Sequence, residues 1–191
     1  MKKIDIRPVY IAKRSRLILS ERTKLDDLIL IQFQRLKIDI PSLIMTYSPI
    51  RKTNEFDPQV ITDYCYFKNP GQQLFYPVMI DDIESPQLIS VIVDDDTVFQ
   101  VNKYGIEEPV DGIDMFPTEI DMVLVPLLTF DKRGHRVGYG KGYYDRFLKQ
   151  CRKDCLKIGF SYFEPIDHID DTNGTDIKLD YCITPETIYQ F

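Results

Sequence analysis

Apolar residues occur along the chain in two patterns, helical spacing and short continuous runs. Between residues 4 and 19, apolar and basic side chains recur at helical spacing. Because Pro8 is tolerated in a first turn, this helix is expected to begin near Arg7. Ser20 is the expected N-cap of the next helix, and Pro58 at a first helical position marks another start. The predicted helices cover residues 7–19, 20–36, 60–67 and 142–151.

The continuous runs are short and end at turn residues, so they predict strands. The most continuous run, 122–128, is followed by a glycine-punctuated loop and a helix, the order found at nucleotide sites in α/β proteins. The acidic and polar residues 164–176 are expected to form a surface loop. The predicted strands cover residues 42–47, 74–80, 88–93, 97–101, 122–128, 156–162 and 178–183.

Length and charge narrow the class of protein. A chain of 191 residues with 43% hydrophobic content can bury one α/β core but is short for two. The net charge of -6 and the pI near 5.0 argue against nucleic acid and anionic membranes as partners, and favour a small molecule. No apolar run approaches the roughly 20 residues that span a bilayer. We expect a monomer.

The four cysteines contain no paired CxxC modules, and the N-terminus does not resemble a signal peptide, so reduced thiols and a cytoplasmic location are predicted. Cys151 and Cys155 would share a helical face and could hold a metal. With two histidines in the chain, however, the ligand set for a structural zinc is short. Packing or surface thiols are the favoured interpretation of Cys65, Cys151, Cys155 and Cys182.

The most informative segment covers residues 130–148. Within it, three glycines alternate with a tyrosine and a lysine over 138–142, so the backbone can approach a ligand closely and point several N–H groups into one concavity. Such a concavity favours phosphate, and Arg136, Lys141 and the following helix N-terminus add positive charge. Neither the Walker nor the dinucleotide-binding pattern matches, and a tight surface turn is the alternative interpretation.

Three further polar features have competing interpretations. Asp145, one turn into the helix, is a carboxylate suited to Mg²⁺ on phosphate oxygens, or a residue placed favourably in a first helical turn. The acidic run 94–96 is expected to form a charged hairpin turn rather than a metal cluster. His135 lies beside Gly134 in a predicted turn and is given no role.

Residues 130–145 resemble the signature of the 5-formyltetrahydrofolate cyclo-ligase family, also called methenyltetrahydrofolate synthetases. The signature is Phe-Asp, a downstream Gly, and Arg-aliphatic-Gly-x-Gly-x-Gly-Tyr-Tyr-Asp, and residues 102–109 resemble the segment ahead of it. The resemblance implies one domain over residues 1–191 with three layers and a mostly parallel open sheet flanked by helices, Rossmann-like and of the NagB/RpiA/CoA-transferase type. It implies that ATP is bound by Lys3, Arg7, Arg14, Arg136, Val137, Gly138, Tyr139, Gly140, Lys141, Gly142, Tyr143 and Tyr144.

The resemblance also assigns the reaction and metal residues. Lys141 and Arg136 would act in catalysis, and Mg²⁺ would be held by Asp145 and Asp176. Without it, the basic first helix is a solvated face and Tyr143 is a core residue. The implied folate-binding residues are Glu55, Tyr139, Gly140, Lys141, Gly142 and Tyr143.

The implied reaction is ATP-dependent cyclisation of 5-formyltetrahydrofolate to 5,10-methenyltetrahydrofolate, with a phosphorylated formyl group as an iminium phosphate intermediate. Three features depart from the family pattern: Pro8, a longer loop around Glu55, and Thr175 where the family often has histidine. They leave two alternatives open. One is a paralogue that binds nucleotide or folate without turnover, and the other is ATP-dependent activation of another small amide or carboxylate.

Overall fold

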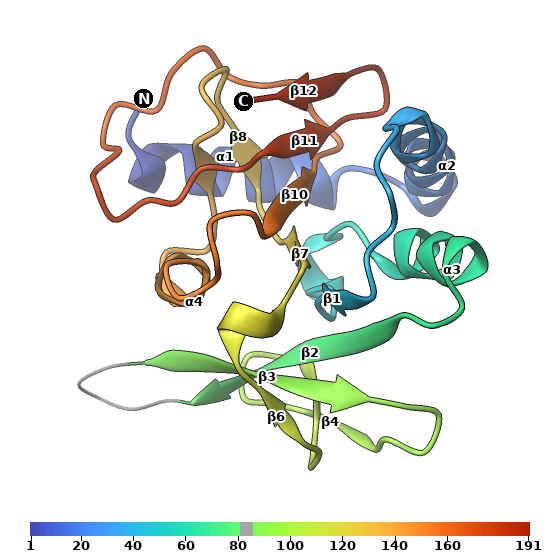
Figure 1. The fold of residues 1–191 in the computed structure, drawn as a ribbon. Coiled ribbons are helices and arrows are strands. Elements are labelled where there is room, and N and C mark those ends of the chain that lie inside the picture. Colours follow the sequence, from blue (N-terminus) through green and yellow to red (C-terminus); the bar gives the residue numbers. More distant parts are fainter. Residues whose placement is uncertain (81–85) are drawn as a thin grey trace.

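In the computed structural model, which describes residues 1–80 and 86–191, an eight-stranded sheet forms the centre of the molecule (Figure 1). Its strand order is β12-β11-β10-β7-β1-β2-β3-β6. The five strands from β11 to β2 run parallel to one another, and the outer strands β12, β3 and β6 are antiparallel to their neighbours. The bounds are β1 (Leu43–Met45), β2 (Gln73–Ile80), β3 (Gln87–Val93), β6 (Asp114–Met115), β7 (Met122–Val125), β10 (Leu156–Phe160), β11 (Tyr181–Ile183) and β12 (Ile188–Gln190).

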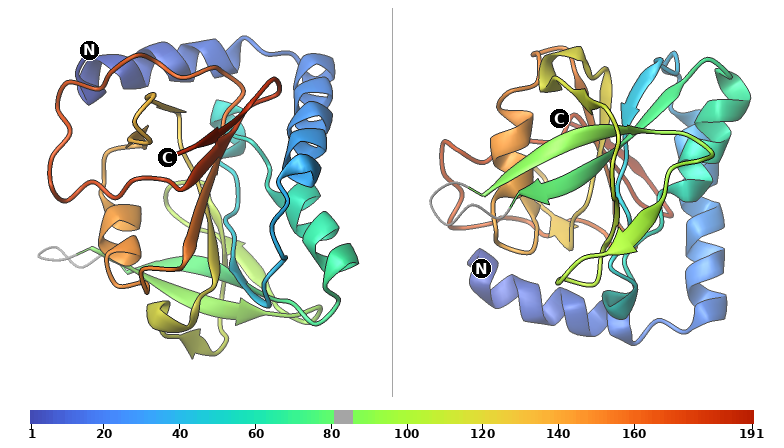
Figure 2. Two further views of the ribbon diagram at one scale, coloured as in Figure 1. Left: turned by 45° about the horizontal axis from the view of Figure 1, so that its top comes forward. Right: turned by 90° about the horizontal axis from the view of Figure 1, so that it is seen from below.

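Helices cover both faces of the sheet, which confirms the predicted fold class (Figures 1 and 2). On β7, Met122 and Leu124 face the cluster that contains α2 and α3, whereas Val123 and Val125 face the cluster that contains α4. Because side chains alternate along a strand, a strand buried on both faces is apolar throughout, which is why the run around β7 is continuous. The helices are α1 (Lys3–Ser15), α2 (Leu19–Arg35), α3 (Gln59–Lys68) and α4 (Tyr143–Leu148).

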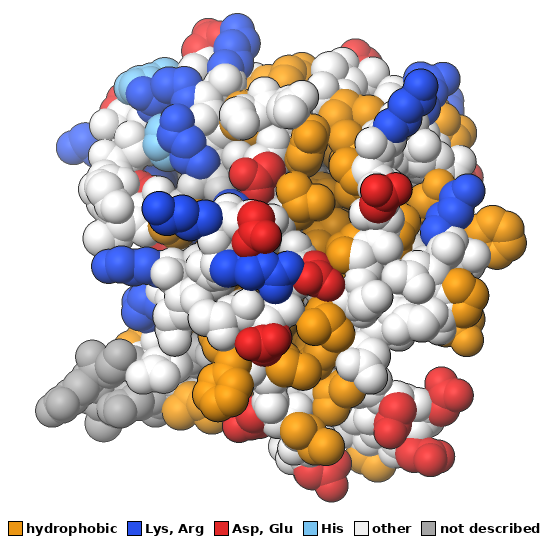
Figure 3. All heavy atoms as spheres, in the orientation of Figure 1, with side chains coloured by type: hydrophobic (Ala, Val, Ile, Leu, Met, Phe, Trp, Pro, Cys, Tyr) orange, Lys and Arg blue, Asp and Glu red, His pale blue; other side chains and the backbone are white. Residues whose placement is uncertain are grey.

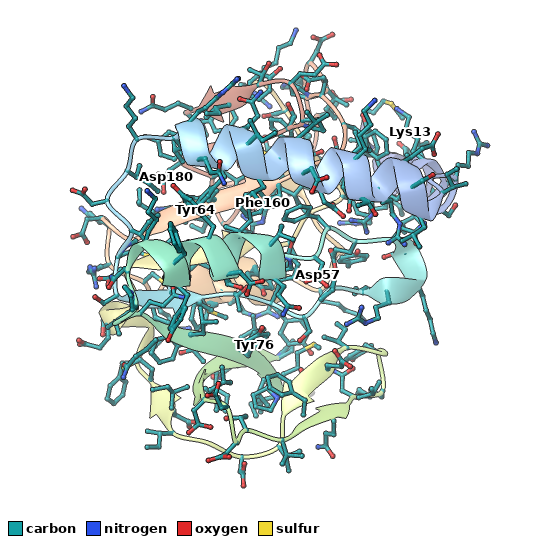
Figure 4. The ribbon with its side chains drawn as sticks, turned by 90° about the vertical axis from the view of Figure 1, so that its right-hand side faces the viewer. Lys13, Asp57, Tyr64, Tyr76, Phe160 and Asp180 are labelled. Atoms are coloured by element: carbon teal, nitrogen blue, oxygen red, sulfur yellow. The ribbon has the colours of Figure 1, made fainter. Side chains whose placement is uncertain are left out.

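Aromatic rings fill the layer between α2, α3 and the sheet. The Phe33 ring lies 5.9 Å from Tyr64 and 6.1 Å from Phe160, centroid to centroid. Phe56 stacks on the Phe160 ring at 4.9 Å. Figure 4 shows Tyr64 and Phe160 in this layer. Ring pairs of this kind add to the area that they bury, so they fix both helices against the sheet.

Two predicted helix starts are wrong. Helix α1 begins at Lys3 rather than near Arg7, and Pro8 lies inside it, because long-range contacts stabilise the first turn. The Lys3 backbone N–H donates to Asp171 at 2.7 Å, and Ile6 is fully buried. Helix α2 begins at Leu19 rather than after a Ser20 cap. The Glu21 carboxylate accepts from the N–H before this helix and so satisfies its start.

Two small antiparallel sheets lie outside the large one. In the first, β4 (Phe99–Val101) pairs with β5 (Glu107–Pro109), and in the second, β8 (Thr129–Phe130) pairs with β9 (Arg136–Val137). The acidic run 94–96 does form a turn, which Asp94 closes by accepting from Thr97. It is not a hairpin turn, since β3 and β4 belong to different sheets. Short 3-10 helices occur as η1 (Arg51–Thr53) and η2 (Pro117–Glu119).

Residues 164–176 are more than the surface loop that their polarity predicts. Ile169 is fully buried against α1, and the Ile166 N–H donates to the Phe130 carbonyl at 2.9 Å. The Lys3 ammonium pairs with Asp176 at 2.5 Å. Figure 2 shows this segment running beside α1. This segment, although polar overall, therefore fixes α1 to the rest of the molecule.

Within the described ranges, no helix is both long and apolar enough to cross a membrane. The four cysteines form no disulfide in this structure, and Cys65, Cys155 and Cys182 are buried. On the face drawn in Figure 3, Lys and Arg side chains gather on the left of the view, whereas the lowest part carries acidic side chains and, among the described residues, no basic ones.

Candidate functional site

A cavity of about 380 Å³ opens at the carboxyl ends of β1 and β7. Tyr47 and Ser48 follow β1 and Pro126 follows β7, and all three line it. The chain leaves β1 toward β2 on one side and leaves β7 toward β10 on the other, so these two strands flank a topological switch point. Open α/β sheets bind ligands at such points, since the loops diverge there and leave a crevice.

Cationic side chains gather at one end of the cavity. Lys3 and Arg7 come from α1, Arg136 from β9, and Lys141 from the glycine loop. The Arg7 guanidinium is held in place because its Nε donates to the Gly138 carbonyl at 2.9 Å. Four cations from three parts of the chain make this end suited to a polyanion.

Two glycines of the loop need their left-handed backbone. Gly140 has φ 95° and Gly142 has φ 72°. A Cβ at Gly140 would lie 2.9 Å from the Arg7 Cζ atom, so the missing side chain lets the guanidinium lie on the loop. Gly138 differs, because a Cβ there would meet no atom within 4 Å. The alternating glycines therefore have unequal roles in shaping the loop.

Glu55 is buried at the cavity wall in a hydrogen-bonded network. Its Oε1 accepts from the Tyr139 hydroxyl at 2.9 Å and its Oε2 accepts from the Ile50 N–H at 2.8 Å. The Arg14 guanidinium lies 3.7 Å from Oε1 and also donates to the Tyr139 hydroxyl and, at 3.1 Å, to Thr53. Burial raises the pKa of the Glu55 carboxyl, and Arg14 acts in the opposite direction. The network joins the Glu55 loop, α1 and the glycine loop.

Two carboxylates lie close to the cationic end, and each is paired. Asp145 Oδ1 accepts from Arg136 Nη2 at 2.9 Å and from the Ile177 N–H at 3.0 Å. Asp176 accepts from the Lys3 ammonium. Among the residues that the structure describes, no three His, Cys, Asp or Glu side chains come together. A cation at this end would therefore be held by one or two of these carboxylates and completed by ligand oxygens and water, a common arrangement for Mg²⁺.

The other end of the cavity is apolar. Pro77 and Met79 of β2, Leu88 of β3 and Ile106 ahead of β5 line it. A buried carboxylate, Glu108, lies in the same wall. The cavity thus has a cationic end and an apolar end, a division that fits both charged and apolar ligand groups.

Comparison with known proteins agrees with this geometry. A model described as the 5-formyltetrahydrofolate cyclo-ligase family matches residues 55–185, which is most of the chain. The chain belongs to this family. That match includes the glycine loop, Glu55 and Asp176, whereas α1 precedes it.

Three relatives of this family member cover 97% or more of it. It is 31% identical over 190 residues to a 5-formyltetrahydrofolate cyclo-ligase from Mycoplasma pneumoniae, which covers 97% of this chain and 100% of the relative. The NMR structure of 5,10-methenyltetrahydrofolate synthetase from Aquifex aeolicus has a TM-score of 0.80 at 27% identity, covering 100% of this chain and 93% of the other. The structure of a Mycoplasma pneumoniae synthetase has a TM-score of 0.74 at 27% identity, covering 97% and 99%.

Most residues predicted for the site of this cyclo-ligase family member do line the cavity. Three do not. Val137 is fully buried in the core beside α1, Arg14 lies behind Tyr139, and Asp176 lies behind Lys3. The predicted residues that line the cavity are Lys3, Arg7, Glu55, Arg136, Gly138, Tyr139, Gly140, Lys141, Gly142, Tyr143, Tyr144 and Asp145.

Sequence reasoning missed the apolar end of the cavity and several polar residues, among them Ser48 and Glu108. Ser48 follows the predicted strand and could have been found from the rule that ligands bind beyond the carboxyl ends of parallel strands. Glu108 falls in segment 102–109, which the resemblance already marked, but no local pattern distinguishes it from its neighbour Glu107. Tyr144 was predicted, and its hydroxyl is buried with no hydrogen-bond partner among the described residues.

Proposed function

We propose that this protein closes 5-formyltetrahydrofolate to 5,10-methenyltetrahydrofolate with ATP, releasing ADP and phosphate. The observation that supports this most directly is the convergence of Lys3, Arg7, Arg136 and Lys141 with a glycine loop in a cavity whose other end is apolar. A triphosphate needs several cations and backbone N–H groups, and a reduced pterin needs a flat apolar wall with few polar groups. Both requirements are met in one cavity by different elements.

The chemical problem is that a formamide carbon does not readily lose its oxygen. In the proposed sequence, the N5-formyl oxygen attacks the γ-phosphorus of ATP, and ADP leaves. The formyl carbon then bears a phosphate and is double-bonded to N5. N10 of the same folate attacks this carbon and loses its proton, and phosphate departs as the methenyl bridge forms. Each step uses atoms of the two substrates, so no protein nucleophile is needed.

The side chains would act by position and charge. Phosphoryl transfer spreads negative charge over the equatorial oxygens, and preorganised donors lower its barrier because they need no reorganisation. The Lys141 side chain is exposed in the loop, so its ammonium can follow the transferred group. Arg136 is buried and fixed, since its Nη1 donates to the Ile177 carbonyl at 2.5 Å. We assign these two residues to transition-state stabilisation.

The carboxylates near the cationic end of the cavity fit Mg²⁺. Asp145 and Asp176 would hold the ion, which prefers hard oxygen ligands and keeps several waters when one or two carboxylates bind it. When bound, Mg²⁺ would supply a counter-charge to the phosphates. Asp145 lines the cavity with its side chain 29% exposed, so it can contact a ligand, whereas Asp176 must first exchange the Lys3 ammonium.

The test is to incubate the purified chain with 5-formyltetrahydrofolate and MgATP, and to follow methenyl absorbance together with ADP release. The proposal requires both products in equal amounts, with each substrate necessary. Folate binding without ADP would instead identify a binding protein. ADP formed with another amide or carboxylate, and not with the folate, would identify a different activation reaction and refute the proposal.

A further inference from the structure

Glu108 is a buried carboxylate that the proposed reaction does not use. It lies in β5 with 8% of its surface exposed and lines the cavity. Its Oε1 accepts from the Met79 backbone N–H at 3.0 Å, which holds the side chain against β2. Because Glu108 lines the cavity, its carboxylate is placed where it can accept hydrogen bonds from a bound ligand.

The surroundings of Glu108 are apolar. Met79 and Leu88, which are paired across β2 and β3, line the same wall, and Ile106 lies two residues before Glu108. The wall therefore has the composition of a ring-binding surface with one polar group in it, which is how small-molecule sites fix orientation. The cations lie in other elements, α1, β9 and the glycine loop.

The second cavity carboxylate, Glu55, lies in the cationic network rather than in the apolar wall. One oxygen accepts from the Tyr139 hydroxyl and lies 3.7 Å from the Arg14 guanidinium, and the other accepts from the Ile50 N–H. A carboxylate has about four acceptor positions in all, so these contacts use much of its capacity. Glu55 is thus well placed to position Tyr139, and less well placed to bind a ligand with two adjacent donors.

We propose that Glu108 is a substrate-binding residue that accepts hydrogen bonds from the pyrimidine edge of the pterin. This rests on the proposed function. The 2-amino group and N3–H of a tetrahydropterin are adjacent donors on one edge, and a carboxylate matches them with its two oxygens. N5, which carries the formyl group, lies on the other ring. Binding the donor edge at Glu108, with the ring on Met79 and Leu88, directs N5 away from this wall toward the rest of the cavity.

The competing explanation is purely structural: Glu108 caps a backbone N–H of β2 and contributes to stability alone. Glu108→Gln separates the two, because glutamine keeps the size and an acceptor for the Met79 N–H but replaces one oxygen with an NH₂ donor. Glu107→Gln is the matched control, since Glu107 is the preceding residue of the same strand and pairs with Arg51 on the surface at 3.6 Å.

The experiment is calorimetry of the full chain and both variants with 5-formyltetrahydrofolate, and separately with MgATP. We expect Glu108→Gln to weaken folate binding at least tenfold, with the Kd for MgATP and the melting temperature unchanged, and Glu107→Gln to match wild type. If Glu108→Gln binds the folate as tightly as wild type, the inference is refuted. If wild type binds MgATP but not the folate, the proposed function fails first.

A second measurement needs no variant and so does not depend on one folding. An analogue of the folate with methyl in place of the 2-amino group lacks one of the two donors. We expect wild type to bind this analogue at least tenfold more weakly than the parent, because a buried acceptor is left unpaired. In Glu108→Gln the difference should disappear. Equal affinity of wild type for the parent and the analogue would overturn the assignment, since a structural cap would not detect the change.

Discussion

Arg136 and Asp145 are joined across the glycine loop by an ion pair with an Nη2–Oδ1 distance of 2.9 Å. The pair links β9 to α4, so it fixes both ends of the loop that lies between them. The Arg136 side chain is 5% exposed, and Asp145 also accepts from the Ile177 N–H. The same pair thus belongs to the stability of the fold and to the charge of the cavity.

Arg136→Ala should lower the free energy of unfolding by about 3 kcal/mol, the low end for a broken buried pair, because Asp145 is partly exposed. Urea unfolding without ligand measures this. Arg136→Lys is the control, since it keeps the charge but not the fork that reaches Asp145 and the Ile177 carbonyl together. It should fall between wild type and the alanine variant. An alanine variant as stable as wild type would show that this ion pair does not stabilise the loop.

Lys141→Ala should lower kcat on the order of 10²-fold and leave the fold intact, because an exposed ammonium in the loop serves the phosphates rather than the core. Lys149→Ala is a matched control on an exposed lysine at the end of α4. Steady-state rates of methenyl formation compare the two. Equal rates for both variants would exclude Lys141 from catalysis.

Gly140→Ala should destabilise the protein by about 1–2 kcal/mol, since φ 95° is unfavourable for alanine and the new methyl displaces the Arg7 guanidinium. Gly138→Ala is the control from the same loop, where a Cβ meets nothing within 4 Å. Thermal unfolding without ligand should show a lower melting temperature for Gly140→Ala only. Equal losses for both variants would contradict the unequal roles of the two glycines.

Glu55 should make stability depend on pH with a definite sign. Its folded-state pKa is raised above 4.5 by burial, so its contribution is present below 4.5 and is lost as pH rises through the raised value. The stability of wild type relative to Glu55→Gln should therefore fall with rising pH over that window. Urea unfolding at several pH values gives this slope. If the substitution also changes stability by an amount that does not depend on pH, the slope stays the same.

Asp131 provides a control of opposite sign. Burial acts to raise the pKa of its carboxyl, but donors from the Arg133 side chain and from backbone N–H groups outweigh it and lower the pKa below 3.8. Its contribution is present above 3.8 and is lost as pH falls through the lowered value. The free energy of unfolding of wild type relative to Asp131→Asn should therefore rise with pH over this range. Slopes of the same sign for Glu55 and Asp131 would contradict one of the two assignments, and the sign shows which.

The parts of the fold that local patterns determine were predictable. The apolar run in β7 signalled a strand buried on both faces, and the alternating glycines signalled a loop with special backbone angles, two of which are observed. Predicted helix boundaries were wrong where contacts with residues distant in the sequence determine them. The chain around Lys3 becomes helical because Asp171 and Asp176 hold its first turn, and nothing near Lys3 in the sequence reports this.

The site residues show the same distinction between local sequence patterns and long-range packing. The glycine loop is continuous in sequence, so its residues were found together, and all of 138–145 lines the cavity. Glu108 was missed because its burial depends on the packing of β5 against β2, which no pattern near residue 108 encodes. Glu55 was expected to contact a ligand directly, and the roles of all these residues stay predictions, as do the monomeric state and the cytoplasmic location.

The pairing of Lys3 with Asp176 has a consequence for synthesis of the protein on the ribosome. The cationic end of the cavity combines the first helix with a segment more than 160 residues later, as the Lys3 N–H to Asp171 contact spans 168 positions. A nascent chain that stops before residue 176 cannot assemble this end. If this end binds nucleotide as proposed, nucleotide can stabilise the protein only after residue 176 has left the exit tunnel, and earlier folding proceeds without that help.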